Sequence, residues 1–207
     1  HRRQRLAADQ AELYRQLAYT DALTGCPNRR YIDEFIEHAV AESARHGSPL
    51  AVAYIDIDNF KLLNDFLGHD EGDQLLRSVT AALRSSVSEP AIFGRFGGDE
   101  FVAVFPGNTV AAARTALDRA RAIVASIELL SGARVTIPAR ISIGIAPFRG
   151  GETPRDLIAA AEDQMYVDKA FVPALAGPAH YEHSPAMAKV SNLKALRNLV
   201  KAIDRRD

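Results

Sequence analysis

One apolar run constrains the fold of this chain more than any other feature of its sequence. Residues 50–55 read Leu-Ala-Val-Ala-Tyr-Ile without interruption, and the run ends directly in Asp56. A strand that is apolar along its whole length is buried on both faces of its sheet. We therefore expect helices on both sides of this strand. Polar residues at its end should lie where open α/β sheets keep their chemistry.

A second feature is the stretch Arg-Phe-Gly-Gly-Asp-Glu-Phe at residues 95–101, between apolar runs at 91–93 and 101–105. Gly-Gly between two strand-like runs predicts a tight hairpin, because glycine adopts positive φ without steric cost. Asp99 and Glu100 then stand at the start of the second strand, where neighbouring side chains point to opposite faces. A polar hairpin tip on a solvated edge is the alternative interpretation. The acidic cluster after the first strand favours a site instead.

The remaining periodicity predicts further helices and strands around these two features. In order, they are a helix ending near Gly47, a short helix after Phe60, a longer helix burying Leu75 to Val87, a helix at 109–130 with Leu117, Ile123, Val124 and Ile127 inward, strands at 134–137 and 139–146, and a helix from Thr153 to Lys169. This order indicates an α/β (α+β) sandwich in which helices flank a mostly antiparallel sheet.

Composition excludes several classes of function. The chain has 207 residues, a formal net charge of −1 and a single cysteine, Cys26. A balanced charge gives no field that would favour nucleic acid or an anionic membrane. A lone cysteine cannot form a disulfide within the chain. No apolar run approaches transmembrane length. We expect a cytoplasmic domain that contacts neither membrane nor nucleic acid.

Two acids at the ends of neighbouring strands would suit a divalent cation. If the strands are neighbours, Asp56 and Asp99 converge, and hard carboxylate oxygens are ligands for Mg²⁺ or Mn²⁺. Backbone N–H groups near Phe60, together with Lys61, could hold phosphate oxygens.

Besides a metal site and a phosphate-binding site, the sequence offers residues that could recognise guanine. A carboxylate such as Asp73 accepts from the N1–H and amine of guanine, and the Asn64 amide can donate to O6 or N7. Taken singly, each of Lys61, Asn64 and Asp73 is more typical of an ordinary surface position on a helix than of a binding site.

Taken together, residues 18–170 resemble the GGDEF-domain family, the diguanylate cyclases. The resemblance rests on motifs in register: Asp21-x-Leu23-Thr24-Gly25-x-x-Asn28-Arg29, Asp56-Ile57-Asp58-x-Phe60-Lys61-x-x-Asn64-Asp65, Gly68-His69-x-x-Gly72-Asp73, Arg95 to Phe101, Ser142-Ile143-Gly144, and Ala161-x-x-x-Met165-Tyr166-x-x-Lys169. The resemblance implies the palm-like fold of class III nucleotide cyclases.

The resemblance also implies an activity. The family condenses two GTP into cyclic di-GMP and two pyrophosphates, with two domains facing each other as a homodimer. Carried onto this chain, the metal ligands are Asp56, the Ile57 carbonyl and Asp99, and either Glu100 or Asp99 itself removes the 3′-proton. The substrate-binding residues are Asn59, Phe60, Asn64, His69, Asp73 and Lys169, and Lys61 stabilises the pentavalent phosphorus.

Two departures from the family pattern modify these expectations. Residues 88–91 are Ser-Glu-Pro-Ala where many members carry Arg-x-x-Asp, so we expect no inhibitory product site. After Lys169 the family usually continues to an arginine, and this chain has Pro173 in that place. Arg29 or Arg30 could substitute for it. The alternatives to a cyclase are a non-catalytic GTP-binding domain that regulates a fused phosphohydrolase, and an interaction module that retains only the fold.

The two ends of the chain complete the predicted organisation. Residues 1–20 read as a signalling or stalk helix, or equally as a frayed surface helix, and residues 21–183 as the GGDEF domain. Residues 184–207 resemble the opening helix of an HD-type phosphohydrolase domain, with an ordinary amphipathic linker helix as the alternative. The chain looks excised from a longer protein.

Overall fold

The computed structural model describes residues 17–130 and 136–170, and the side chains of residues 129, 130 and 136–138 are not described. Its centre is a sheet of four strands in the order β2-β3-β1-β6, in which all three pairings are antiparallel. The strands are β1 (Leu50–Ile57), β2 (Ile92–Arg95), β3 (Glu100–Pro106) and β6 (Ile141–Pro147). Two further strands, β4 (Glu128–Leu130) and β5 (Thr136–Pro138), form a separate two-stranded sheet.

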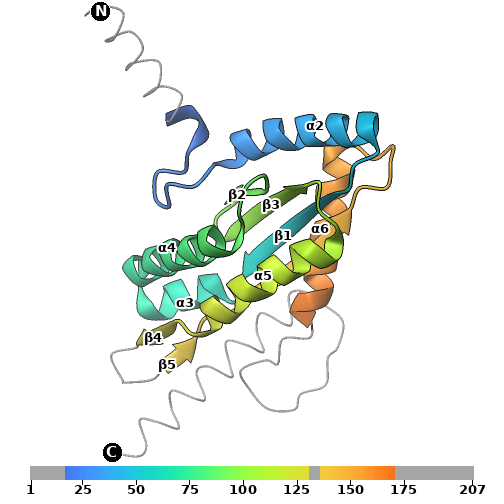
Figure 1. Ribbon diagram of the computed structural model, residues 1–207. Helices are drawn as coiled ribbons and strands as arrows, with labels where there is room; N and C mark the ends of the chain where they lie inside the picture. The colour runs from blue at the N-terminus through green and yellow to red at the C-terminus, as the bar shows by residue number, and fades with distance from the viewer. Residues whose placement is uncertain (1–16, 131–135, 171–207) are drawn as a thin grey trace, which may run out of the picture. The chain divides into compact units, whose positions relative to one another are not determined.

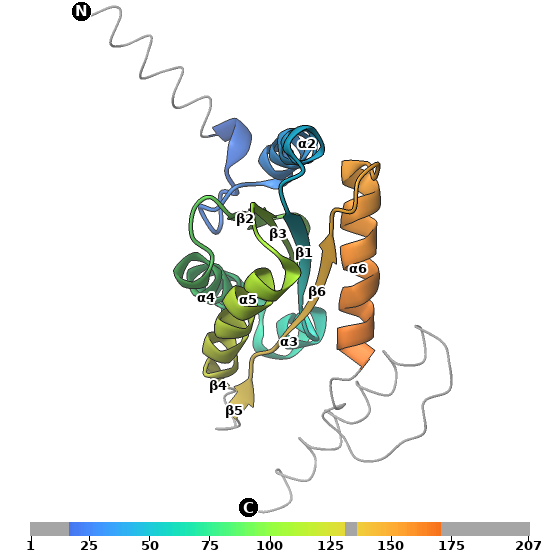
Figure 2. The same cartoon turned by 45° about the vertical axis from the view of Figure 1, so that its right-hand side comes forward.

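Helices cover both faces of this sheet, as the continuous apolar run predicts. They are α2 (Arg29–His46), α3 (Phe60–Leu67), α4 (His69–Ser86), α5 (Val110–Ala125) and α6 (Pro154–Ala170). Figures 1 and 2 show α4 and α5 on one face, with α2 and α6 on the other. All eight residues of β1 are buried, which confirms the two-sided burial. The predicted fold class, a mostly antiparallel sheet flanked by helices, is correct.

The face of the sheet under α2 and α6 carries one apolar cluster. Val52, Tyr54, Val102 and Val104 contribute from the strands, and Ile32, Ile36, Leu157 and Met165 from the helices. Successive strand residues alternate between faces, so the even-numbered residues of β1 point toward α2 and α6. Asp56 continues this series at the end of the strand. The cluster therefore ends at the predicted acidic site.

The helix ends follow local chemistry. The Asn28 side chain accepts from the Tyr31 N–H at the start of α2, and Gly47 closes that helix with φ of 63°. Thr153 Oγ1 accepts from the Asp156 N–H while Asp156 accepts from the Thr153 N–H, a reciprocal cap at the start of α6. These ends agree with the predictions for both helices.

Several predicted boundaries are wrong. Helix α5 ends at Ala125, and residues 128–130 form strand β4 rather than the end of a helix. Ile123, predicted to point inward, is 43% exposed, whereas Leu117 and Val124 are buried. Helix α4 begins at His69, six residues before Leu75, the first of the residues predicted to be buried on it. The predicted helices at 1–20 and 184–207 lie wholly or largely outside the described residues.

Candidate active site

The strand register brings the two predicted acidic clusters together. Strand β1 lies between β3 and β6, and its Asp56 pairs with Glu100 on β3 and with Ser142 on β6. The Ile57 N–H donates to the Asp99 carbonyl oxygen at 3.1 Å. Residues directly opposite in an antiparallel pair share a face of the sheet. Glu100 is thus the acid that shares the face of Asp56, while Asp99 lies just before β3 begins.

Asp56 is a buried carboxylate that contacts a lysine from α6. It is 8% exposed, and Lys169 Nζ lies 2.5 Å from its Oδ1. Burial raises the pKa of the Asp56 carboxyl to about 6, although the bond and charge of Lys169 oppose the change. The nearby charges of Asp99 and Asp58 raise this pKa further. An additional cation at this position would therefore be attracted by several carboxylates.

The glycines of the hairpin serve a different purpose from the predicted one. Neither Gly97 nor Gly98 has positive φ, so conformational freedom is not why glycine stands there. A Cβ on Gly97 would lie 2.1 Å from Glu100 Oε2, so glycine leaves room for this carboxylate. The N–H groups of Phe96 and Gly97 both donate to the Glu100 carbonyl oxygen and close the turn.

Glu100 also has an apolar neighbourhood on the α2 and α6 face. The Tyr54 hydroxyl is buried. Burial is the main reason that the pKa of Tyr54 is raised, and a hydrogen bond with Glu100 raises it further. The Tyr54 ring meets Phe96 edge to face, with ring centroids 6.0 Å apart. This packing fixes the hairpin over the end of β1, so Glu100 has a defined position relative to Asp56.

Arg95, the first residue of the signature, ties the hairpin to the N-terminal turn. Its guanidinium donates to the Gly98 carbonyl at 2.6 Å and to both oxygens of Asp21 at 3.2 Å. Burial acts to raise the pKa of Asp21, but hydrogen bonds from Thr24 and the charge of Arg95 outweigh it and lower this pKa. Sequence reasoning placed both residues in motifs without assigning them this role. The ion pair holds the turn that carries Asp99.

Asp58 is a buried acid that sequence reasoning left without a role. It is 6% exposed, and Ser142 Oγ donates to its Oδ1 at 2.6 Å. Its other oxygen is buried and has no hydrogen-bond partner among the described residues. Burial raises the pKa of Asp58. Its repetition two residues after Asp56 was the available signal, because residues two apart in a strand share a face.

The segment after Asp58, predicted to bind phosphate, forms a sharp turn into α3. Asn59 adopts the left-handed conformation, with φ of 58°, and α3 starts at Phe60. The first N–H groups of a helix have no partner within the helix and favour an anion. Lys61 is exposed on the first turn of α3. Backbone donors and a lysine are thus available one short turn from Asp56.

The two predicted guanine-binding residues lie on neighbouring helices. Asn64 on α3 approaches Gly72 on α4 so closely that a Cβ there would lie 1.7 Å from Asn64 Oδ1. Asp73 is the next residue of α4 and is half-buried. Asn64 Oδ1 is buried without a hydrogen-bond partner among the described residues. His69, at the exposed start of α4, completes the set of residues that α3 and α4 supply.

The arrangement suits a cation that brings most of its own ligands. The described residues contain no group of three or more His, Cys, Asp and Glu side chains that could hold a metal ion. Mg²⁺ commonly takes one or two carboxylates and completes its shell with water and substrate phosphates. The buried Asp56, with Asp99 nearby and the Asn59 turn adjacent, fits that pattern. The partly satisfied charge of Asp56 is the observation that supports the fit.

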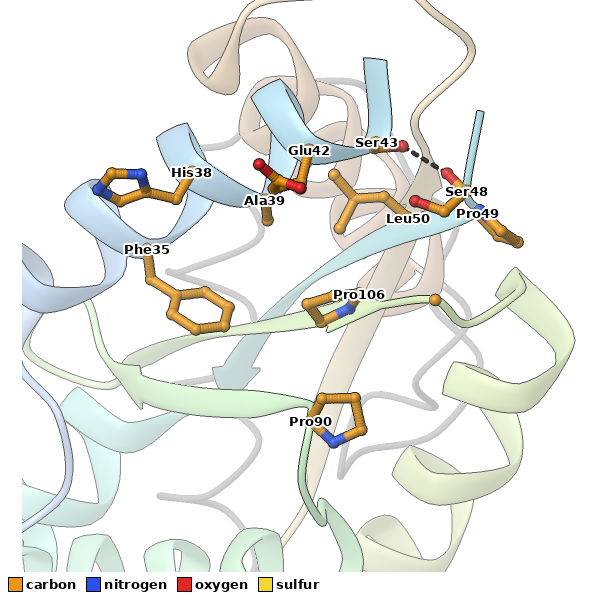
Figure 3. A pocket seen from close by; sticks show the side chains of 11 residues that line it. Phe35, His38, Ala39, Glu42, Ser43, Ser48, Pro49, Leu50, Pro90 and Pro106 are labelled. Atoms are coloured by element: carbon orange, nitrogen blue, oxygen red, sulfur yellow. Dashed lines mark hydrogen bonds between the residues drawn. The ribbon is translucent and has the colours of Figure 1, made fainter. Parts of the chain in front are cut away.

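The cavity shown in Figure 3 lies elsewhere on the domain. It has a volume of about 360 Å³, and its apolar lining includes Phe35, Leu50, Pro90 and Pro106. Leu50 and Pro106 form the first pair of the β1–β3 ladder, whereas Asp56 and Glu100 form the last. Six strand steps of about 3.4 Å place the cavity roughly 20 Å from the acids. It is therefore separate from the acidic site.

No helix among the described residues is long and apolar enough to cross a membrane.

Comparison with known proteins identifies the family. The model of the family described as "Diguanylate cyclase, GGDEF domain" matches residues 18–171. The chain is 38% identical over 153 residues to the diguanylate cyclase DgcP of Pseudomonas aeruginosa, covering 73% of this chain and 22% of DgcP. It is 37% identical over 157 residues to the response regulator PleD of Caulobacter vibrioides, covering 75% of this chain and 35% of PleD. The chain thus spans about a fifth to a third of these relatives.

A solved structure supports the same assignment. The GGDEF domain of DgcB from Caulobacter crescentus, determined in complex with c-di-GMP, superimposes with a TM-score of 0.70 at 32% identity. The match covers 74% of this chain and 91% of that domain. Its palm-like cyclase fold agrees with the antiparallel sheet and flanking helices described above. This chain belongs to the GGDEF family of diguanylate cyclases.

Proposed function

We propose that this domain condenses two GTP molecules into cyclic di-GMP and releases two pyrophosphates, with Mg²⁺ or Mn²⁺ at Asp56, the Ile57 carbonyl and Asp99. The observation that carries the proposal is the register that sets Asp56 opposite Glu100 and bonds Ile57 to Asp99. This register is an observation of the structure, independent of the assignment to a family. Their meeting beside the Asn59 turn supports phosphoryl chemistry at this end of the sheet.

The reaction has the same bond changes at each of its two steps. The 3′-oxygen of one GTP bonds to the α-phosphorus of the other, and the bond from that phosphorus to the pyrophosphate oxygen breaks. Glu100 takes the proton of the 3′-hydroxyl, with Asp99 as the alternative acceptor. Bound Mg²⁺ supplies Lewis-acid stabilisation of the charge on the phosphate oxygens. Lys61 adds positive charge beside the phosphorus as negative charge accumulates.

Other residues bind and orient the nucleotide. The N–H groups at Asn59 and Phe60 hold phosphate oxygens at the start of α3. Asp73 accepts from guanine N1–H and its amine, Asn64 donates to the base, and His69 lines the same end of α4. Lys169 is the residue predicted to hold the terminal phosphates, and in this structure its Nζ contacts Asp56. We propose that it leaves Asp56 for those phosphates when the metal and GTP bind.

Two facing domains are needed, because each holds one of the two GTP molecules. We propose a homodimer for catalysis, with residues 21–183 as the cyclase domain. Residues 1–20 would act as a signalling helix, and residues 184–207 as a linker that opens an HD-type domain.

A second candidate function is a GTP-binding regulatory domain without turnover. Two observations favour it: Pro173 replaces the arginine expected to assist Lys169, and Lys169 contacts Asp56, the acid proposed to bind the metal. Such a domain would bind GTP and regulate a fused phosphohydrolase.

Incubation of the purified 207-residue chain with GTP and MgCl₂ separates the candidates. We expect cyclic di-GMP, detected by chromatography and mass spectrometry, and no product from Asp99→Asn. Asp163→Asn is the matched control, since Asp163 is an exposed acid of α6 outside the site. GTP binding without product would favour the regulatory domain. Absence of GTP binding would overturn both proposals.

A further inference from the structure

The last turn of α6 carries one member of a second ion pair, between Asp168 and Arg121, directly beside Lys169. Asp168 precedes Lys169 in the chain and is 31% exposed. Its Oδ2 accepts from the Ile143 N–H at 2.8 Å and from Arg121 Nη2 at 2.5 Å. The pair thus joins three elements, since Ile143 belongs to β6 and Arg121 to α5.

The Ile143 N–H is a donor on the strand that ends the sheet within residues 17–130 and 136–170. Strand β6 is the last strand in the order β2-β3-β1-β6, and β1 is its one strand partner among the residues that the structure describes. Alternate N–H groups of such an edge strand point away from the sheet and need another acceptor. Asp168 supplies that acceptor from α6. The helix is therefore bonded to the edge of the sheet one residue before Lys169.

Arg121 fixes the same carboxylate from the other face of the sheet. Helices α5 and α6 cover opposite faces, as Figure 2 shows, and the Arg121–Asp168 pair joins them around the β6 edge. Arg121 lies farther from Asp118 on its own helix, at 3.8 Å. Its strongest contact is thus with α6.

An acidic residue at the position of Asp168 would destabilise an isolated helix. An acid in the last turn meets the negative end of the helix dipole. Asp168 is in the last turn of α6, which ends at Ala170. An acid in this place is explained by its tertiary contacts, because the helix alone favours a neutral or basic residue there.

We infer that Asp168 and Arg121 are positioning residues that hold the last turn of α6 so that Lys169 Nζ reaches the acidic site. Neither residue touches the reacting atoms. They act through Lys169, whose Nζ lies at Asp56. The use of Lys169 for GTP phosphates rests on the proposed function, whereas its placement at Asp56 does not.

The test measures Lys169 directly, without nucleotide. The protein is treated briefly with an acetylating reagent, and modification of each lysine is quantified by mass spectrometry. Contact with Asp56 shields Nζ, so we expect labelling of Lys169 to rise about threefold in Asp168→Ala and in Arg121→Ala. Lys61 is the internal reference. Asp56→Asn, which removes the partner itself, calibrates the assay and should raise labelling as well.

Matched and conservative variants distinguish the positioning of Lys169 from a general destabilisation of α5 and α6. Asp163→Ala and Arg119→Ala remove exposed charges from the same two helices and should leave Lys169 labelling at the wild-type value. Arg121→Lys keeps a cation opposite Asp168 and should restore part of the protection. Asp168→Asn keeps an acceptor for the Ile143 N–H and covers the case that Asp168→Ala fails to fold.

The outcomes distinguish this inference from the proposed function. In an active enzyme, Asp168→Ala should also raise KM for GTP, while Asp163→Ala should not. An inactive wild-type protein whose Lys169 labelling still rises in the variants would support the positioning role and count against the cyclase proposal. Unchanged labelling in Asp168→Ala and Arg121→Ala, with a clear rise in Asp56→Asn, would overturn the inference.

Discussion

Gly144 is the position where a single methyl group should disturb both stability and catalysis. It lies on β6 opposite Tyr54, where α6 crosses the sheet. A Cβ at this position would lie 2.0 Å from the Ala161 carbonyl oxygen and 2.1 Å from the Met165 nitrogen. Both atoms belong to the helix backbone, so no side-chain rotation can relieve the contact. The helix must retreat from the sheet.

The size of the effect follows from these distances. Real Cβ contacts are rarely shorter than 3.0 Å, so α6 must move by about 1 Å in Gly144→Ala. Overpacking of this kind costs about 2 kcal/mol of unfolding free energy. For a domain of this size that cost lowers Tm by about 4–8 °C. The same movement displaces Lys169, and a misplacement of about 1 Å can reduce turnover roughly 100-fold.

Thermal unfolding by circular dichroism and turnover of GTP test this reasoning together. Ala160→Ser is the control, because Ala160 is exposed on the same helix and its substitution should leave Tm within about 2 °C. A Gly144→Ala variant with wild-type Tm and turnover would show that α6 does not need its close approach to β6.

Three further predictions concern the Asp21 ion pair, guanine recognition by Asp73 and the need for a dimer. Asp21→Asn should lower the unfolding free energy at pH 7 by about 1.5 kcal/mol, through lost bonds to Thr24 and Arg95. Because the folded pKa of Asp21 is lowered, its contribution is present above about pH 4 and is lost as the pH falls through the folded pKa. The difference between wild type and variant should shrink on acidification, and a difference independent of pH would contradict the ion pair. Asp73→Ser should raise KM for GTP about tenfold or more and narrow the preference for GTP over ATP, measured in parallel assays with each nucleotide. Unchanged selectivity would remove Asp73 from base recognition. If two facing domains share the reaction, activity per milligram should rise with protein concentration. A constant specific activity down to the lowest concentrations would argue against catalysis by a reversibly formed dimer.

The sequence predicted the core of the fold and the meeting of the acids for a physical reason. A strand that is apolar throughout can only be central, and the signature hairpin must pair with a neighbour. The pairing of Asp56 with Glu100 is consistent with this, because β1 ends and the antiparallel β3 begins at the same edge of the sheet. The alternation of side chains along a strand also predicted that Asp99 and Glu100 point to opposite faces. The structure places Glu100 on the same face as Asp56.

The errors occur where local pattern competes with tertiary structure. The apolar periodicity of α5 continues through Ile127, but Ser126 and Ile127 donate to the carbonyls of Ile123 and Val124, and the chain leaves the helix there. A three-residue strand such as β4 carries too little pattern to be recognised without its partner. Ile123 was assigned inward by spacing alone, although within residues 17–130 and 136–170 no element covers that side of α5 closely enough to bury it.

The contacts of Lys169 could not have been predicted from spacing. Asp56 lies 113 residues earlier in the chain, and Arg121 reaches Asp168 across 47 residues. Only the packing of α6 on β6 brings these groups together. The hairpin glycines illustrate the same limit, because the crowding of Glu100 against Gly97 is a side-chain contact that backbone propensity does not contain.

The most direct test of the site is to locate the metal. Crystals grown with Mn²⁺ and a non-hydrolysable GTP analogue should show an anomalous peak within coordination distance, about 2.2 Å, of oxygens from both Asp56 and Asp99, with Lys169 Nζ moved away from Asp56. Manganese bound elsewhere, or a nucleotide whose phosphates lie away from the Asn59 turn while Lys169 remains on Asp56, would contradict the account.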